Sequence, residues 1–398
     1  MTRTPRLALS LAISMLLVFA ATAPAEAAKR KVPFGFFGTV LNNSQSDRMS
    51  DAALDAQMAS MARSGVESVR VSVTWASVER SPGAYDFRQT DRVIRAAAAH
   101  RLDVLPIVLG TPVWASTNPT DPRRALLYAP TDPQLYANFL TTLVRRYGPR
   151  GSFWASSGTP RVPIRNWQIW NEPAADFFWA TRPWPSTYRR LLRAGYRAVH
   201  RADRKATVVL GSLTGVGGST PWGQLRQLYR AGAKGFFDAV SVHFFSAAPS
   251  VRITAQQTVK VAALLRREMK RGRDRKRKIW FTELTWTAAQ GKIPKSAQLG
   301  FETTPKGQAA RLRTVFPALA KGRKRLGIGR VYWYTWGSEY VPQLTPFGPG
   351  TPTFQYAGLN RWDGSGDGFQ PLPILRTFAG TAARFEGCRK SANARRCR

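Results

Sequence analysis

The stretch WQIWNEP, residues 167–173, runs an apolar, strand-like segment directly into a glutamate. The stretch IWFTE, residues 279–283, does the same further along the chain. Short apolar runs that end in polar or turn-forming residues are typical of strands buried on both faces of a sheet. The sequence therefore predicts two buried strands that end near Glu172 and Glu283.

Similar runs recur along the chain and alternate with helical patterns. The candidate strands are residues 32–38, 68–74, 104–109, 164–170, 207–211, 239–244, 278–282 and 330–334. Such an alternation in one chain of 398 residues predicts an α/β fold, a single-domain (β/α)8 TIM barrel. A doubly wound open sheet is the alternative architecture, although no glycine-rich phosphate turn follows the first strand.

Several helix starts are marked by capping residues. Asp132 and Thr304 each precede a proline, the arrangement expected at an N-cap and a first helical turn. Ser186 is a third candidate cap, and the last helix is expected at residues 371–384.

The amino terminus has the features of an export signal. Two arginines precede an apolar stretch at residues 7–23, and Ala-Glu-Ala at 25–27 fits a signal-peptidase site. We therefore expect a signal peptide at 1–27, a barrel domain at 28–385 and a basic tail at 386–398, in a secreted protein that can also associate with the cell wall. An uncleaved membrane anchor is the alternative for the leader, and no later run is long enough to cross a bilayer.

Cys388 and Cys397 both lie in the basic tail. After export they either close a small disulfide loop or remain free thiols.

The carboxyl ends of the strands form the active face of a barrel, so a polar residue that closes a strand there is a catalytic candidate. Glu172 and Glu283 close the fourth and seventh candidate strands. Cleavage of a glycosidic bond needs one acid to protonate the leaving oxygen and one carboxylate at the anomeric carbon. The structural alternatives are a turn for Asn-Glu-Pro and a salt-bridged barrel residue for Glu283.

With these residues the chain resembles glycoside hydrolase clan A, nearest to its family 39 and family 5 (cellulase-like) members, over the whole barrel. In that clan the fourth strand ends in Asn-Glu and the seventh ends in a glutamate, as at Asn171-Glu172 and at Glu283. Further residues similar to the clan are Arg70, the stretch WASVERSPGAYDF at 75–87, Asp91, His243 and Trp336.

The resemblance implies a role for each matched position. Glu172 would be the general acid and base, Glu283 the nucleophile, and Asn171 a contact to the sugar hydroxyl beside the reacting carbon. Arg70 would orient Glu283 or neutralise a structural acid, and His243 would either bind substrate or be a core histidine.

One position departs from the clan, which has a tyrosine where this chain has Phe245. Without that hydroxyl, Glu283 lacks a usual hydrogen-bond donor, which Tyr334 or Tyr340 would have to supply.

Aromatic residues at or just past strand ends are candidates for stacking on sugar rings. These are Trp75, Trp114, Trp170 and Trp336, the last being favoured because it matches the clan. Glu339 is a weaker candidate for the site, and Asp86 is expected in a turn. His100, His200 and His243 show no metal-ligand spacing, so neither a metal nor a cofactor is expected.

The chain carries a formal net charge of +37, which favours polyanionic partners. The basic runs at 270–278, 201–205 and 321–325, with Arg145, Arg146 and Arg150, fall in predicted helix-to-strand turns, on the face opposite the carboxylates. This face is a candidate for binding an anionic cell-wall or surface polymer. Alternatively, the residues only complement helix dipoles.

These observations favour a secreted, retaining hydrolase of β-glycosidic bonds in oligo- or polysaccharides. A transglycosylase with the same site and a non-catalytic carbohydrate or cell-wall binding protein on a barrel scaffold are the alternatives. A nucleic-acid binder ranks third, because no basic-aromatic binding module is present.

Overall fold

The computed structural model of the chain describes residues 29–215, 219–338, 344–345, 348–349, 351–365 and 367–387. The predicted leader at 1–27 lies outside the described residues, as do Glu339, Tyr340 and both cysteines.

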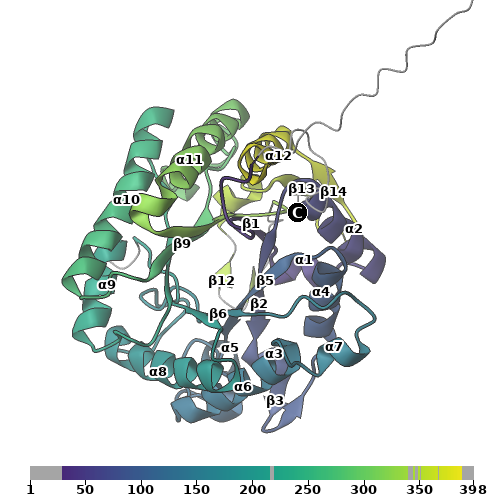
Figure 1. Cartoon of the computed structure of the whole chain (residues 1–398), viewed down its shortest axis with the longest axis vertical. Coiled ribbons are helices and arrows are strands. Elements are labelled where there is room, and N and C mark those ends of the chain that lie inside the picture. Colours follow the sequence, from purple (N-terminus) through teal and green to yellow (C-terminus); the bar gives the residue numbers. More distant parts are fainter. Residues whose placement is uncertain are drawn as a thin grey trace, which may run out of the picture.

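Eight parallel strands close into a barrel in the order β1-β10-β9-β8-β7-β6-β5-β2 (Figure 1). Their bounds are β1 (Phe37–Val40), β2 (Ser68–Thr74), β5 (Asp103–Leu109), β6 (Asn166–Ile169), β7 (Thr207–Val209), β8 (Ala239–His243), β9 (Lys278–Leu284) and β10 (Ile328–Trp333). Parallel strands require crossover connections, which here are helices packed around the outside. The predicted (β/α)8 barrel is confirmed.

Each barrel strand is followed by one long helix of the outer ring (Figure 1). In chain order these are α2 (Asp51–Arg63), α4 (Arg88–Ala99), α6 (Pro133–Tyr147), α8 (Trp184–Ala202), α9 (Pro221–Arg230), α10 (Val251–Arg271), α11 (Pro305–Leu326) and α12 (Pro373–Glu386). Asp132 and Thr304 cap α6 and α11 as predicted, accepting hydrogen bonds from the backbone N–H groups of Gln134 and Gly307. None of the described helices combines the length and apolar character needed to cross a bilayer.

Short elements decorate the connections. The short helices are α1 (Asn43–Ser46), α3 (Trp75–Val78), α5 (Pro122–Ala125) and α7 (Phe153–Ser156), with 3-10 turns at Val113–Ala115, Lys295–Ala297 and Pro352–Tyr356. The small antiparallel pairs are β3 (Glu79–Ser81) with β4 (Ala84–Tyr85), β11 (Leu344–Thr345) with β12 (Gly348–Pro349), and β13 (Asn360–Trp362) with β14 (Phe369–Pro371).

Several predicted boundaries are wrong by two residues or more, and three of them have a clear structural reason. The first strand starts at Phe37 because Gly35, at a φ of 77°, turns the chain just before it. Helix α8 starts before Ser186, whose hydroxyl donates back to the carbonyl oxygen of Pro183 instead of capping the helix. The last helix starts late, at Pro373, because residues 369–371 pair as β14.

Side chains fill the barrel interior in layers. An apolar layer consists of Val40, Leu105, Val209, Ala239, Trp280 and Tyr332. At the amino ends of the strands, Arg330 donates hydrogen bonds to Ser68 and Asp103, which closes that end. The carboxyl ends form the opposite opening, called the mouth below, and the candidate residues lie there.

Candidate active site

Glu172 and Glu283 meet at the mouth with His243 between them. Glu172 follows β6 by three residues, whereas His243 ends β8 and pairs in register with Glu283 of β9. One carboxylate oxygen of each glutamate and one ring nitrogen of His243 all lie within 4.8 Å of one another. The side chains of Glu172 and Glu283 are 11% and 13% exposed, so the cluster is largely buried yet open to the mouth.

The backbone that presents Glu172 is strained. Trp170 and Glu172 have φ angles of 67° and 37°, in the left-handed region that side chains disfavour. Tyr188 holds this segment by donating its hydroxyl to the carbonyl oxygen of Ile169 at 2.7 Å. The indole N–H of Trp170 is fixed on the carbonyl oxygen of Phe178 at 2.7 Å. Strain that surrounding contacts hold in place is a recurring property of functional sites.

Arg70 on β2 links the residues of the mouth. It donates one hydrogen bond to Glu283 at 2.6 Å, one to the side-chain oxygen of Asn171 at 2.9 Å, and one to Gln168 at 2.9 Å. The guanidinium is fully buried, so its ion pair with Glu283 is protected from solvent screening. Because its oxygen accepts from Arg70, Asn171 turns its NH₂ group toward other partners.

A layer of polar side chains supports Arg70 from below. Gln168 donates to the hydroxyls of Ser212 at 2.9 Å and Ser241 at 3.2 Å. Ser241 in turn bonds Thr282 at 2.5 Å. This layer was not predicted, although isolated polar residues inside apolar runs, as in WQIW and AVSVH, indicate it.

His243 contacts both glutamates. Its Nδ1 lies 2.5 Å from Oε1 of Glu172, and its Nε2 lies 3.4 Å from Oε1 of Glu283 without a hydrogen-bond partner among the described residues. Burial lowers the pKa of His243 to about 3, so the ring is neutral at physiological pH. When Nε2 carries the single ring proton, that N–H faces Glu283, and Nδ1 accepts a hydrogen bond from the protonated carboxyl of Glu172.

The two glutamates differ in electrostatic environment. Burial raises the pKa of Glu172 to about 7, against the opposing field of Arg70. Burial also raises the pKa of Glu283, but Arg70 opposes the rise there through a direct hydrogen bond. A single proton shared by this site therefore resides on Glu172, while Glu283 remains the anion paired with Arg70.

Glu172, His243 and Glu283 have the spacing of possible metal ligands. Arg70 already supplies a positive charge 2.6 Å from Glu283, and it would repel a cation at that carboxylate. The donor set therefore suits proton transfer better than metal binding.

Most of the aromatic candidates are buried and not exposed at the mouth. Trp75, Trp170 and Trp336 are fully buried, and a ring without an exposed face cannot stack on a sugar. Trp75 donates to Glu79 and stacks on Phe139, and Trp336 donates to Gln57 of α2 at 2.9 Å. The expectation that Trp75 and Trp336 are substrate platforms is therefore wrong.

Trp114 and Tyr334 remain candidates because both are only half-buried. Trp114 packs edge-on against Trp75, and Tyr334 packs edge-on against Phe354 at 5.1 Å. Phe245 contacts Phe354 as well, so this side of the mouth is aromatic and apolar. Asp86 lies outside a turn, in the short connection between β4 and α4, where it pairs with exposed Arg88.

Comparisons with solved structures show the same barrel. A family 39 glycoside hydrolase from Bacteroides cellulosilyticus WH2 matches with a TM-score of 0.60 and 19% identity, over 89% of this chain and 64% of that chain. A glucosidase from Croceicoccus marinus matches with a TM-score of 0.62 and 14% identity, over 90% of this chain and 70% of that one. A family 5 mannosidase from Rhizomucor miehei matches with a TM-score of 0.57 and 13% identity, over 91% of this chain and 96% of that chain.

The chain thus spans 64% of the length of the family 39 enzyme. No protein-family model matches the sequence, and no curated protein matches it. At these identities the likeness establishes the fold, which is that of family 39 and family 5 glycosidases.

Proposed function

We propose that the protein is a retaining O-glycoside hydrolase that cleaves β-glycosidic bonds in an oligo- or polysaccharide. The observation that supports this most directly is the placing of Glu172 and Glu283 at one mouth, with carboxylate oxygens within 4.8 Å. Retaining enzymes hold their two carboxyl groups about 5–5.5 Å apart, and inverting ones about 6.5–9.5 Å to leave room for water. The short separation therefore favours retention.

In the first step Glu172 protonates the glycosidic oxygen while Glu283 attacks the anomeric carbon. The leaving alcohol departs with that proton, and the sugar is left as an ester on Glu283. In the second step Glu172, now ionised, removes a proton from water, and the resulting oxygen displaces Glu283. Both glutamates return to their starting protonation states.

Neighbouring residues prepare these steps. Arg70 keeps Glu283 ionised for attack, and the raised pKa of Glu172 keeps a proton available near neutral pH. Asn171, oriented by Arg70, has its NH₂ group available for the hydroxyl beside the reacting carbon. The neutral His243 fixes the carboxyl of Glu172.

The neighbouring structures include a glucosidase and a mannosidase, so aryl β-glucosides and β-mannosides are the first substrates to test. Transglycosylation needs the same site with a sugar hydroxyl in place of water, and a rate that depends on added acceptor would reveal it. Residues 1–27 support export, which amino-terminal sequencing of the secreted protein checks.

The decisive experiment replaces the attacking group. We expect Glu283→Gln to lose at least about 10⁴-fold in kcat/KM on the aryl glycoside that the wild type cleaves. A 2-fluoro glycoside should label Glu283 in the wild type, and the released sugar should keep its anomeric configuration by NMR.

Glu67→Gln is the matched control, because Glu67 is also fully buried but accepts from Arg30 and Gly35 near the start of β2. It should keep its activity per folded molecule. An inverted product, or a Glu283→Gln protein as active as Glu67→Gln, would exclude the proposed mechanism.

A further inference from the structure

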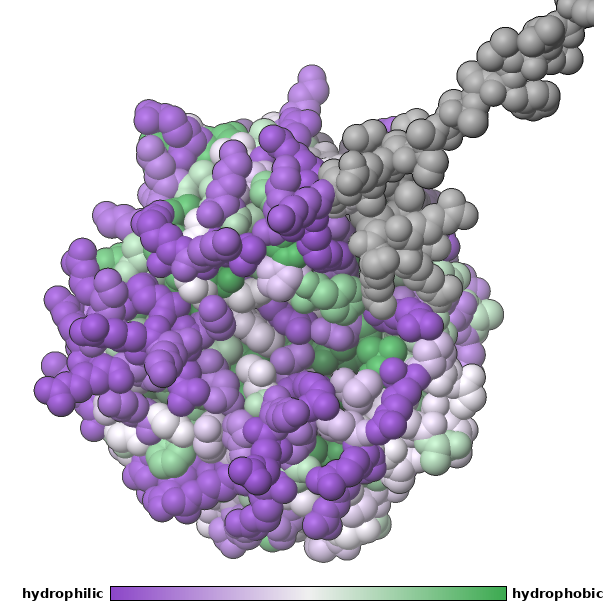
Figure 2. All heavy atoms as spheres, viewed as in Figure 1, coloured by the Kyte–Doolittle hydropathy of each residue, from purple (hydrophilic) through white to green (hydrophobic). Residues whose placement is uncertain are grey.

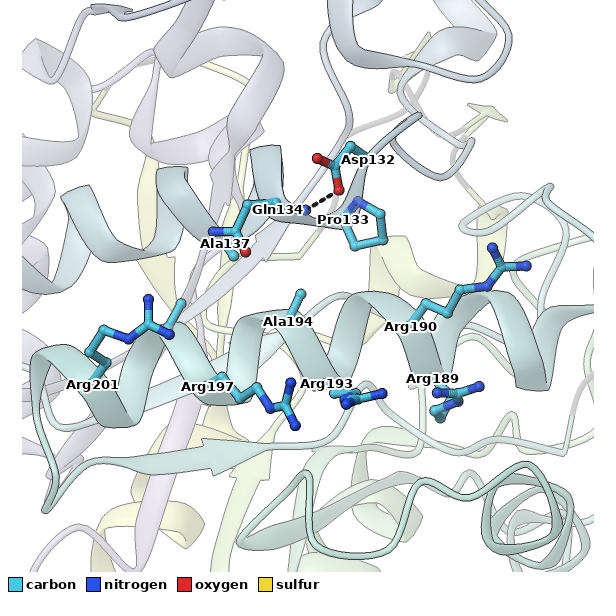
Figure 3. A pocket seen from close by; sticks show the side chains of 11 residues that line it. Asp132, Pro133, Gln134, Ala137, Arg189, Arg190, Arg193, Ala194, Arg197 and Arg201 are labelled. Atoms are coloured by element: carbon cyan, nitrogen blue, oxygen red, sulfur yellow. Dashed lines mark hydrogen bonds between the residues drawn. The ribbon is translucent and has the colours of Figure 1, made fainter.

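A groove lined by arginines lies on the outside of the barrel, between α6 and α8. It has a volume of about 390 Å³. Figure 3 shows its arginines along α8, beside the first turns of α6. We call it the flank groove, and its lining arginines are Arg189, Arg190, Arg193, Arg197 and Arg201.

The arginines follow the helical repeat. Arg189, Arg193, Arg197 and Arg201 are spaced four residues apart, which is slightly more than one turn. Each step advances about 6 Å along the helix, so the row extends about 18 Å. The guanidinium of Arg193 packs over the ring of Phe236, and those of Arg197 and Arg201 lie on the exposed surface, beside which a linear ligand can extend.

The positive charge of the flank groove is not neutralised by the protein. Within the described part of the chain, none of these five arginines forms an ion pair, and the Nε atoms of Arg189 and Arg193 are buried without an acceptor. Asp132 is the one acidic residue of the lining, and its carboxylate caps α6 by accepting from Gln134 at 2.8 Å. Buried donors without acceptors are unfavourable, which points to an anion as the missing partner.

Some arginines elsewhere on the surface are neutralised by acidic neighbours. Figure 2 shows hydrophilic side chains spread over the side formed by α8 to α11, where three arginines have acidic partners. Arg277, in the basic run before β9, pairs with both Asp238 and Asp274. Arg226 and Arg271 share Glu268. Among the described residues, the arginines of the flank groove have no such partners.

The chemistry of the lining residues limits which classes of ligand the groove can bind. A guanidinium presents a planar fork of N–H donors that matches a carboxylate or a phosphate. The lining contains no aromatic residue, whereas single-stranded nucleic acid is held by aromatic rings on which bases stack. The groove suits a linear polymer that carries regularly spaced anions and offers no bases.

The groove is also separate from the mouth. Helix α8 starts at Trp184, after the loop that carries Glu172, and runs toward the opposite end of the barrel, where β7 begins. A polymer in the groove would therefore lie along the flank.

We propose that the flank groove binds a linear acidic polysaccharide through its carboxylates, outside the active site. The choice of a polysaccharide over another polyanion rests on the proposed glycosidase function, while the anionic character of the ligand rests on the groove alone. Such a site would hold the protein on an acidic polymer independently of turnover at the mouth.

The test measures binding of polygalacturonate to the Glu283→Gln protein, so that hydrolysis cannot interfere. Arg190, Arg197 and Arg201 are exposed, and replacing all three with Gln should leave the thermal unfolding temperature unchanged. The matched control replaces Arg252, Lys260 and Arg267, three exposed basic residues of α10, and removes the same charge.

We expect the groove triple variant to weaken binding by about tenfold at about 100 mM NaCl, and the α10 variant by less than about twofold. Equal losses in both variants would show that overall charge attracts the polymer, and would overturn the proposal. Inorganic polyphosphate that binds as tightly, with the same dependence on the three arginines, would overturn the choice of a polysaccharide. Failure of the glycosidase proposal would appear separately, in the Glu283→Gln activity assay.

Discussion

The mouth and the flank groove use arginine in opposite ways. At the mouth a single buried arginine, Arg70, donates to Gln168, Asn171 and Glu283. In the flank groove Arg197 and its neighbours are at least partly exposed and have no carboxylate partner in the described structure.

The two arrangements suit different roles, positioning of a reacting carboxylate at the mouth and ligand binding in the groove. Three hydrogen-bond partners hold Arg70 in place, so its positive charge is fixed beside the carboxylate of Glu283. The charges of the flank groove have no acidic partner in the described structure, so they are available to an anionic ligand, and solvent ions screen them. Changes at the mouth should therefore affect chemistry and folding, and changes in the groove should affect retention on a polymer.

The largest effect tests the acid at the mouth. Glu172→Gln should lower kcat/KM by about 10²–10⁴-fold on an aryl glycoside with a poor leaving group. In the wild type, kcat/KM should fall as the pH rises through about 7, because Glu172 then loses the proton that it must donate. This alkaline limb should be absent in Glu172→Gln, as steady-state pH profiles would show.

The leaving group provides an internal control. An activated leaving group departs with little protonation of its oxygen. For such a substrate the first step, cleavage of the glycosidic bond, should therefore be nearly as fast in Glu172→Gln as in the wild type. If the loss were the same for poor and good leaving groups, Glu172 would not be the acid.

The next prediction compares the same arginine-to-glutamine substitution at the mouth and in the flank groove. Arg70→Gln leaves Glu283 buried without its partner, and we expect the free energy of unfolding to fall by about 3–5 kcal/mol. Arg197→Gln should change it by no more than about 0.5 kcal/mol. Urea denaturation of both variants measures the contrast, and Arg70→Gln should be less destabilised at low pH, where Glu283 can bind a proton. Similar values for the two variants would mean that the ion pair at the mouth contributes little to stability.

The fold could be predicted because strands that are buried on both faces of a parallel sheet consist of continuous apolar runs. The run that ends at Glu283 and the run that ends at Glu172 both became barrel strands. Failures occurred where tertiary pairing or turn geometry decides the boundary. Residues 369–371 join a hairpin with β13 instead of starting the last helix, and Gly35 delays the first strand.

The candidate site was only partly predictable. The sequence places Asn171, Glu172, His243 and Glu283 at strand ends and Arg70 within the second strand, and barrel closure brings them together. Whether an aromatic ring after a strand points into the core or into the mouth depends on the local backbone geometry. The burial of Trp336 could therefore not be predicted from the sequence. The flank groove was not predicted either, since it depends on how the arginine side chains of α8 lie beside the first turns of α6.

The smallest effect expected at the mouth is its response to salt. Raising NaCl from about 50 to about 500 mM should change kcat/KM on a neutral aryl glycoside by less than about twofold, because the Arg70–Glu283 pair is buried from the ions. Over the same range, retention on polygalacturonate should fall severalfold, because the arginines of the flank groove are reached by solvent. Parallel measurements on one protein sample make the comparison direct. If hydrolysis of the neutral glycoside fell in step with polymer retention, the mouth would be as exposed to ions as the groove, and the separation between the two regions would not hold.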